Sequence, residues 1–85
     1  MYQVTTMYFV YVLKNPSNKH YIGLTSNIEK RLKKHNTGSG RWTKYKGPWE
    51  LAYHESFEYK KDAAKREREI KSYKGGNAFK KLIAQ

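Results

Sequence analysis

One run of residues constrains the fold of this chain more than any other, the uninterrupted stretch from Met7 to Leu13 (M-Y-F-V-Y-V-L). Every residue in it is aromatic, β-branched or long and aliphatic, and no polar residue marks an exposed face. A half-exposed strand would alternate between apolar and polar residues, whereas a strand covered on both faces reads as a continuous apolar run. The sequence therefore predicts a strand with other elements packed against both of its faces.

Composition limits the core that this strand can join. The chain has 85 residues, of which 38% are hydrophobic, so we expect one domain with a thin core. Eight Tyr, three Phe and two Trp supply large buried areas and leave hydroxyl groups for polar interactions. Cysteine is absent, which excludes disulfides and thiolate zinc sites and suits a reducing cytosol. We expect residues 1–6 to be a short lead-in and residues 7–85 to form the single domain.

The charge of the chain points to a polyanionic partner. Eighteen Lys and Arg residues against seven Asp and Glu residues give a formal net charge of +11. Nucleic acid is the first interpretation, and an anionic membrane surface is the lesser alternative. No apolar run approaches the roughly 20 residues that span a bilayer, and residues 1–6 lack the pattern of a secretory signal. We expect a soluble cytoplasmic protein, with association with the nucleoid or nucleus as a variant.

Turn residues and periodicity predict the remaining elements. The turn-forming run Asn15–Asn18 separates the first strand from a second strand at residues 20–25, which indicates an antiparallel hairpin. Four further elements follow in chain order: a helix that starts at Ser26 or Asn27 and ends near Asn36, a strand at 49–56, a helix at 59–73 closed by Gly75 and Gly76, and a short helix at 77–84. The fold class is α+β, a small three-stranded antiparallel sheet flanked by helices in the order β-β-α-β-α-α.

Two details of these elements bear on packing. In the first helix, Ile28, Leu32 and His35 fall on one face, which predicts that this face is buried. In the third strand, Leu51 and Tyr53 alternate with more polar neighbours, which predicts that both side chains lie on one face of the sheet.

Two tyrosines stand out on the hairpin. Tyr11 and Tyr21 point to the same face if the residue numbers of paired positions sum to an even number, but sequence leaves this register open. Core packing is the plain interpretation of both side chains. Gly23 follows Tyr21 by two positions and faces the same side, where it leaves room for a group that approaches Tyr21. A bulge or a tight bend is the alternative explanation of this glycine.

Arg31 and His35 are four residues apart and share one face of the first helix. A solvated basic helix is the plain interpretation, and the neighbouring lysines fit it. Arg31 differs from them because a guanidinium group forks onto phosphate oxygens and keeps its charge. His35 is either a half-buried helix residue or a group that binds phosphate and moves a proton.

Glu67 is the carboxylate of most interest. Ala63, Glu67 and Ile70 lie at i, i+4 and i+7 of the second long helix, so Glu67 is predicted on the apolar stripe that faces the sheet. Glu69 is rotated about 200° from Glu67 and is expected to pair with Arg66 or Lys65. An acid on the inner face needs a partner, and a buried ion pair with Arg31 is the structural alternative to a metal site.

A basic and aromatic segment from Arg41 to Lys46 fits nucleic-acid contact, because cations neutralise phosphates and aromatic rings stack on bases. Trp42 is equally well explained as a core residue. The candidate nucleic-acid-binding residues are Lys19, Lys34, Arg41, Trp42, Lys44 and Lys46. His20 and His54 are expected to be structural, and the spacing of the histidines does not indicate a zinc site.

Taken together, these features resemble the GIY-YIG nuclease superfamily, in particular its small single-domain members. Phe9-Val10-Tyr11 stands at the first family triplet and Tyr21-Ile22-Gly23 at the second. The first triplet departs from the family pattern, since Phe9 and Val10 stand where Gly and Ile are common. The resemblance covers residues 7–83 and continues through Asn27–Leu32, His35-Asn36, Arg41–Thr43, Pro48–Leu51 and Ala64–Lys71.

The resemblance implies a metal-dependent endonuclease that attacks phosphorus in line with water and acts on branched, flapped or nicked DNA in repair or recombination. It implies that Tyr11 and Tyr21 position or deprotonate the water, with Tyr11 favoured for the proton. Arg31 would offset developing negative charge, and His35 would assist proton transfer or bind phosphate. Glu67 would hold one divalent cation, Mg²⁺ or Mn²⁺.

Alternatives remain open at this point. A non-catalytic nucleic-acid-binding module could use the same scaffold, and a basic RNA-binding or ribosome-associated protein would explain the charge alone. DNA is the expected partner, with RNA as the alternative. We expect the chain to be too small for its own specificity domain, so surface shape, dimerisation or a protein partner would supply selectivity. Monomer and weak homodimer are both compatible with the sequence.

Overall fold

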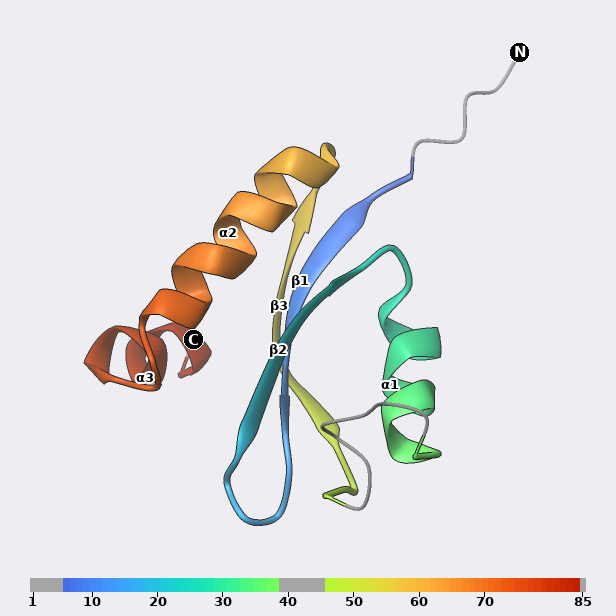
Figure 1. The fold of residues 1–85 in the computed structure, drawn as a ribbon, viewed down its shortest axis with the longest axis vertical. Coiled ribbons are helices and arrows are strands. Elements are labelled where there is room, and N and C mark those ends of the chain that lie inside the picture. The colour runs from blue at the N-terminus through green and yellow to red at the C-terminus, as the bar shows by residue number, and fades with distance from the viewer. Residues whose placement is uncertain (1–5, 39–45, 85) are drawn as a thin grey trace.

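A computed structural model describes residues 6–38 and 46–84. Its elements are β1 (Tyr8–Lys14), β2 (His20–Thr25), α1 (Ile28–Asn36), β3 (Glu50–Phe57), α2 (Lys60–Ser72) and α3 (Asn77–Ile83). Figure 1 shows the sheet nearly edge-on, with α1 on one side and α2 and α3 on the other. The predicted α+β class and element order are confirmed, and most predicted boundaries lie within one residue of those observed.

Strand β1 is the central strand of the sheet, whose order is β2-β1-β3 with antiparallel pairing throughout. All four residues from Val10 to Leu13 have no exposed surface. Val10 and Val12 belong to a cluster beneath α2 and α3, whereas Tyr11 and Leu13 belong to a second cluster on the α1 face. The two clusters explain the continuous apolar run, because each face of β1 contributes to a different half of the core.

The turn between β1 and β2 depends on Asn15, which is buried. Its side-chain oxygen accepts from the Lys19 amide at 2.8 Å, and its Nδ2 donates to the Lys46 carbonyl at 2.9 Å. Asn18 takes a positive φ of 61°, a conformation that asparagine tolerates better than most residues. One buried carboxamide therefore closes the hairpin and ties it to the segment that precedes β3.

Helix α1 starts as its sequence predicts. Asn27 is the N-cap, and its side-chain oxygen accepts from the Lys30 amide at 3.0 Å. Ile28 and Leu32 pack against the cluster on this face of the sheet, and His35 is buried, so the predicted inner face is confirmed. At the other end of the helix, Asn36 accepts from the Trp49 amide at 2.6 Å and donates to the Trp49 carbonyl at 3.0 Å.

The alternation expected for β3 is wrong. Tyr53 pairs with Val12 and packs with the cluster beneath α2, but Leu51 pairs with Leu13, whose side chain lies on the α1 face. The register shifts between Val12 and Leu13, which inserts an extra residue into β3. Such a bulge reverses the alternation of faces. Leu51 therefore does not share a face with Tyr53, and 37% of its surface is exposed.

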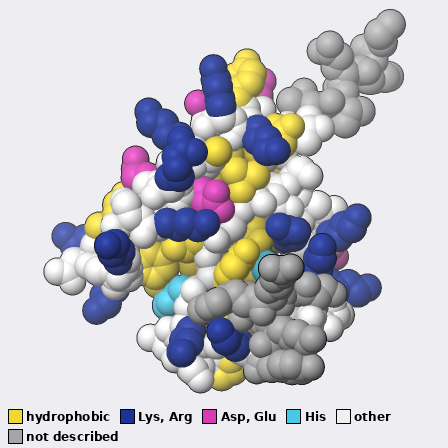
Figure 2. All heavy atoms as spheres, viewed as in Figure 1, with side chains coloured by type: hydrophobic (Ala, Val, Ile, Leu, Met, Phe, Trp, Pro, Cys, Tyr) yellow, Lys and Arg dark blue, Asp and Glu magenta, His cyan; other side chains and the backbone are white. Residues whose placement is uncertain are grey.

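Helices α2 and α3 cover the other face through a few apolar residues. Ala63 and Ile70 of α2 are fully buried, and Phe79 and Leu82 of α3 extend the same cluster. Gly75, at a φ of 73°, allows the chain to turn between the two helices. None of the helices within residues 6–38 and 46–84 is long and apolar enough to cross a membrane. Lys and Arg side chains are spread over the visible surface, with the acids scattered among them (Figure 2).

Candidate active site

The two hairpin tyrosines lie on the same face of the sheet. Tyr11 pairs with Gly23, and Leu13 pairs with Tyr21, so paired residue numbers sum to an even value. The rings of Tyr11 and Tyr21 are 6.2 Å apart, centroid to centroid. The ring of His35 lies 4.7 Å from that of Tyr21 and 6.1 Å from that of Tyr11. Helix α1 thus brings a histidine against both tyrosines.

Gly23 makes room for Tyr11 rather than for a group that approaches Tyr21. A Cβ atom on Gly23 would lie 2.4 Å from the Tyr11 hydroxyl oxygen and 2.5 Å from its Cζ. The Tyr11 ring therefore lies directly over the bare backbone of its paired residue. This corrects the expectation from sequence: the glycine serves the tyrosine on the neighbouring strand, because paired residues in a sheet share a face.

The Tyr11 hydroxyl and His35 Nε2 form a buried hydrogen bond of 3.1 Å. Burial raises the pKa of Tyr11, and Arg31 opposes this rise by hydrogen bonding to the hydroxyl. Burial also lowers the pKa of His35, with further lowering by the charges of Arg31 and Lys34. At neutral pH the pair therefore consists of a protonated phenol and a neutral imidazole, and the tautomer of the imidazole decides which of the two donates the hydrogen bond.

Arg31 directs a positive charge at this pair. It is half-buried on α1, and its Nε atom is buried without a hydrogen-bond partner among the described residues. A buried donor without a partner is costly, and an anion that accepts from it would recover that cost. The arrangement suits a phosphate oxygen, because a guanidinium group can bind a phosphate through two parallel hydrogen bonds.

Glu67 lies on the edge of the predicted inner stripe rather than in its centre. Ala63 and Ile70 are buried, but the Glu67 side chain is 21% exposed and forms an ion pair with Lys71 at 3.4 Å. The expectation of a fully inward-facing acid is therefore only partly right. The charge of Glu67 is among the causes that raise the pKa of Tyr11, so the carboxylate acts electrostatically on the tyrosine group.

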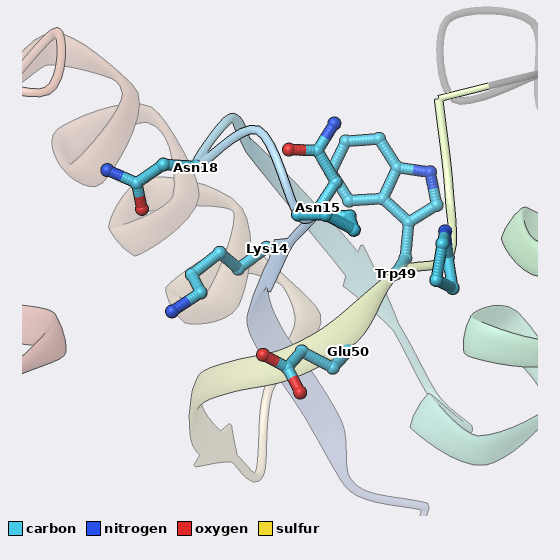
Figure 3. A pocket seen from close by; sticks show the side chains of 7 residues that line it. Lys14, Asn15, Asn18, Trp49 and Glu50 are labelled. Carbon is cyan, nitrogen blue, oxygen red and sulfur yellow. The ribbon is translucent and has the colours of Figure 1, made fainter.

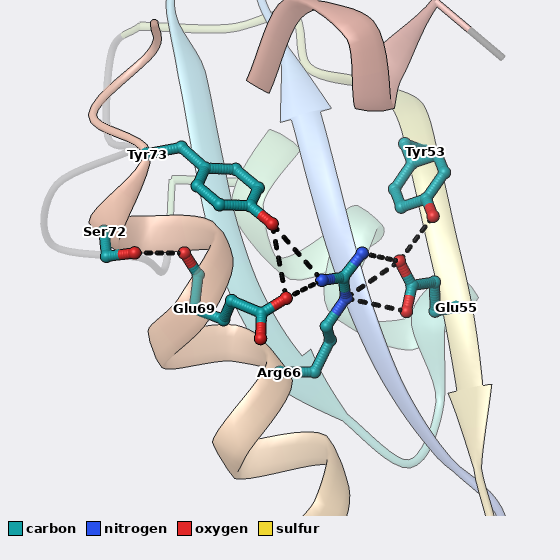
Figure 4. Close-up of polar contacts among 6 residues, drawn as sticks. All are labelled: Tyr53, Glu55, Arg66, Glu69, Ser72 and Tyr73. Atoms are coloured by element: carbon teal, nitrogen blue, oxygen red, sulfur yellow. Dashed lines mark hydrogen bonds and ion pairs between the residues drawn. The ribbon is translucent and has the colours of Figure 1, made fainter. Parts of the chain in front are cut away.

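A polar network between α2 and β3, on the other side of the buried stripe of α2 from Glu67, fixes the rotation of this helix (Figure 4). Arg66 Nε donates to both carboxylate oxygens of Glu55, at 3.0 and 3.1 Å, and its Nη2 donates to one of them at 3.0 Å. The Tyr53 hydroxyl also bonds to Glu55. Burial tends to raise the pKa of Glu55, but the hydrogen bonds from Arg66 and Tyr53 outweigh it and lower that pKa.

The same network confirms one prediction and adds residues that sequence reasoning missed. Glu69 pairs with Arg66 as expected, and the Tyr73 hydroxyl donates to Glu69 at 3.2 Å. Glu55 was missed because its partner Arg66 is 11 residues away on another element, a separation that no local spacing rule links. Successive residues are about 100° apart on a helix. Since Arg66 reaches β3, the adjacent Glu67 lies on the flank nearer to β2.

The donor set around Glu67 fits a magnesium-type ion held by one carboxylate. The described residues contain no group of three or more His, Cys, Asp or Glu side chains that could enclose a metal. Mg²⁺ often binds one or two carboxylates and completes its shell with water and substrate phosphate. The ion pair with Lys71 leaves the carboxylate accessible, because the Lys71 side chain is 55% exposed and can move away. Glu67 could therefore hold one divalent cation.

The other residues predicted from sequence are more scattered. The ring of His20 lies 5.0 Å from that of Phe79, edge to face, and the ring of His54 lies 6.3 Å from that of Phe9. His54 is exposed, so its structural role stays a prediction. Lys19 and Lys46 line a hollow of about 300 Å³ at the hairpin turn. The candidates Arg41, Trp42 and Lys44 lie outside the described residues.

A hollow of about 480 Å³ beside the hairpin turn has no part in the tyrosine group. It is lined by Lys14, Asn15, Pro16, Asn18, Pro48, Trp49 and Glu50. Figure 3 shows Lys14 and Glu50 extending from neighbouring strands, with Trp49 on the other side. The paired tyrosines, Arg31 and His35 do not line this hollow.

The fold and the polar group define a small α+β domain whose tyrosine–histidine pair and half-buried arginine suit phosphate chemistry. A family model described as the GIY-YIG catalytic domain matches residues 7–80, and the chain belongs to this family. It therefore carries a nuclease-type domain, for which nucleic acid is the implied substrate class.

Individual relatives are similar to this chain over most of its length. The chain is 47% identical over 66 residues to a UPF0213 protein of Clostridium perfringens, a match that covers 76% of this chain and 71% of that protein. It is 42% identical over 67 residues to a UPF0213 protein of Staphylococcus saprophyticus, covering 78% and 82%. The solution NMR structure of a UPF0213 protein from Bacillus halodurans is 30% identical, covers 86% of this chain and 90% of that one, and superposes with a TM-score of 0.48.

Proposed function

We propose that this protein is a metal-dependent endonuclease that hydrolyses phosphodiester bonds in DNA and prefers branched, flapped or nicked structures. The observation that supports this most is the meeting of Tyr11, His35 and Arg31 on one face of the sheet. There the neutral, hydrogen-bonded pair of Tyr11 and His35 lies beside the guanidinium group of Arg31. The Nε atom of Arg31 is buried and has no hydrogen-bond partner among the described residues. The proposed biological setting is DNA repair or recombination in the cytoplasm or nucleoid.

Arg31 is the proposed phosphate ligand. Its position on α1 is set by the packing of Ile28 and Leu32 against the sheet, so the guanidinium group is held before substrate binds. Negative charge grows on the phosphate oxygens as water attacks phosphorus. A pre-positioned cation stabilises that charge more strongly than the ground state, which lowers the barrier.

Tyr11 and His35 are the proposed proton relay. Because burial raises the pKa of Tyr11, the phenol is not a base by itself. Its oxygen can accept a hydrogen bond from the attacking water while its own proton passes to His35 across 3.1 Å. The pKa of His35 is lowered by burial, which leaves the imidazole neutral and able to receive that proton at neutral pH. Tyr21 packs against the imidazole and orients it.

Glu67 is the proposed ligand of a single Mg²⁺ or Mn²⁺. When bound, such a cation would neutralise phosphate charge and make water a stronger nucleophile. The network around Arg66 would keep Glu67 in place by fixing the rotation of α2. Binding without sequence preference is consistent with a charge of +11, since phosphate contacts carry no base information. Selectivity would then come from DNA shape or from a protein partner.

Isosteric substitution of Glu67 tests the proposal. In Mg²⁺, Glu67→Gln should slow cleavage of a branched DNA by a factor of about 10³ or more, because the amide is a poor cation ligand. Arg31→Ala should cause a similar loss. Glu58→Gln and Arg68→Ala are the matched controls, since both residues are exposed and lie outside the tyrosine group. Circular dichroism would verify that every variant is folded.

Each outcome has a defined meaning. Near-wild-type turnover by both Glu67→Gln and Arg31→Ala would refute the proposed site. DNA binding that EDTA does not affect, without cleavage in Mg²⁺ or Mn²⁺, would instead support a non-catalytic binding module. Competition between branched DNA and structured RNA at one stated salt concentration would decide between the two nucleic acids.

A further inference from the structure

A polar hollow of about 430 Å³ lies where β2 leads into α1. It is lined by Thr25, Ser26, Asn27, Lys30, Arg31 and Lys34. Two of these side chains build its wall. The Thr25 hydroxyl donates to the Asn27 carbonyl and accepts from the Asn27 amide, and the Asn27 oxygen caps the helix. The groups that remain available to a ligand are mainly the cationic side chains of Lys30, Arg31 and Lys34.

The charged side chains that line this hollow are all positive. Lys30 and Lys34 are four residues apart on α1 and therefore lie on one face of the helix, with Arg31 beside them. No acid lines the hollow, and within residues 6–38 and 46–84 none of the three cations forms an ion pair. Figure 2 shows Lys and Arg side chains gathered around the position of α1. Like charges held this close repel one another unless an anion binds between them.

The hollow is continuous with the tyrosine group through Arg31. This residue lines the hollow and also lowers the pKa of Tyr11 against the effect of burial, and its buried Nε has no partner among the described residues. Lys34 is close enough to His35 for its charge to lower the pKa of the imidazole, after burial and Arg31. An anion in the hollow would therefore lie directly beside the proposed reaction centre.

We propose that this hollow is a second phosphate subsite, which binds the backbone phosphate adjacent to the one that is cleaved. The inference rests on the proposed nuclease function and extends it. Arg31 has several donors in a planar fork, so it can serve the scissile phosphate and border the neighbouring one. Lys30 and Lys34 act as point charges on the second phosphate. The substrate strand must then continue over α1, beyond the nucleotide that is cut.

Binding without cleavage gives the most direct test. Fluorescence anisotropy of a labelled branched DNA in EDTA, over a series of KCl concentrations, measures the number of phosphate contacts. Because both lysines contact one phosphate, Lys30→Gln/Lys34→Gln should lower the slope of log Kd against log salt by about 0.9, and should raise Kd about tenfold near 0.1 M salt. The control is Lys61→Gln/Lys65→Gln on α2, which has the same charge change, spacing and exposure. It should leave the slope within error.

Cleavage kinetics distinguish the role of this subsite from that of the reaction centre. In Mg²⁺, Lys30→Gln/Lys34→Gln should show most of its loss in KM, because the lysines hold a phosphate that does not react. Lys30→Arg/Lys34→Arg should restore KM, since the charge is kept. Inorganic phosphate tests the alternative source of the anion. If the subsite binds a backbone phosphate of the DNA, millimolar inorganic phosphate should compete only weakly with the DNA. The competition should be equally weak for the wild type and for the Lys61→Gln/Lys65→Gln control.

Equal salt slopes for Lys30→Gln/Lys34→Gln and the α2 control would overturn the proposal, because affinity would then follow net charge alone. Strong competition by inorganic phosphate that the double variant loses would also overturn it in favour of a free-anion site. These binding results are independent of turnover. If Glu67→Gln proved fully active, the catalytic proposal would fail while the salt slopes still reported on the subsite.

Discussion

Gly23→Ala should damage the proposed reaction centre through one methyl group. The new Cβ would lie 2.4 Å from the Tyr11 oxygen, 2.5 Å from Cζ and 2.9 Å from Cε1. Ordinary van der Waals contact begins at 3.4 Å, so the ring must move by about 1 Å. Tyr11 has no exposed surface and therefore cannot move into solvent. The movement must come from the ring, from His35 or from the pairing of β1 with β2.

The expected cost follows from this displacement. Overpacking of a core by one methyl group costs about 1–3 kcal/mol of unfolding free energy. For a domain of this size, that corresponds to a loss of roughly 5–15 °C in Tm. A displacement of about 1 Å at a reaction centre lowers turnover by a factor of about 100. The hydrogen bond between Tyr11 and His35, at 3.1 Å, would lengthen or break.

Thermal unfolding and single-turnover cleavage of branched DNA measure the two effects. Gly75→Ala is the control, because Gly75 has a φ of 73° and a Cβ atom added there would meet no other atom within 4 Å. It should cost about 1 kcal/mol of stability through backbone strain, without loss of cleavage. Gly23→Ala should lose both. Adding Tyr11→Leu to Gly23→Ala should recover stability relative to the sum of the single changes, since the clashing ring atoms are removed.

Wild-type Tm and turnover in Gly23→Ala would refute this reasoning. They would show that Tyr11 does not lie over Gly23, or that its position has no bearing on cleavage. Loss of stability with full turnover would be consistent with the close packing of Tyr11 on Gly23 but would reject Tyr11 as part of the reaction centre.

Three further predictions concern stability. Asn36→Ala removes both side-chain hydrogen bonds to the Trp49 backbone and should lower the free energy of unfolding, measured by urea denaturation, by about 1 kcal/mol. An unchanged urea midpoint would contradict this prediction. Arg66→Gln should cost about 1–2 kcal/mol at pH 7, because it leaves Glu55 half-buried without its ion pair. Hydrogen bonding to Arg66 lowers the folded-state pKa of Glu55 despite burial, so wild-type stability is lost as pH falls through that pKa. The Tm of Arg66→Gln should therefore fall less steeply than that of the wild type as the pH is lowered. Burial lowers the pKa of His35, so below about pH 6.5 the unfolded chain binds the proton more readily and stability falls. His35→Gln should reduce this fall in melts between pH 8 and 5, and identical slopes would contradict the assignment.

Local patterns predicted much of the fold. The run from Met7 to Leu13 indicated a strand covered on both faces, and β1 is that strand. The inner face with Ile28 and Leu32 was also confirmed. The structure selected Asn27 from the two N-cap candidates and Arg66 from the two candidate partners of Glu69. These features depend on residues within a few positions of one another. Periodicity and capping are therefore visible in the sequence itself.

Pairing between distant segments was decided only by the tertiary structure. The even register of the hairpin brought Tyr11 over Gly23, and the bulge in β3 separated Leu51 from Tyr53, although alternation had placed them together. Either register suits the same local sequence, so the choice depends on what packs on each face.

The same distinction holds for the candidate site. Sequence alone placed Arg31 and His35 on one helical face and brought Tyr11 and Tyr21 into one hairpin, because four-residue and strand spacings are geometric constants. Only the packing of α1 against the sheet joined the histidine to the tyrosines. Glu67 lies at the flank of α2 because a network with β3 sets the rotation of that helix, and helical periodicity within α2 contains no information about β3.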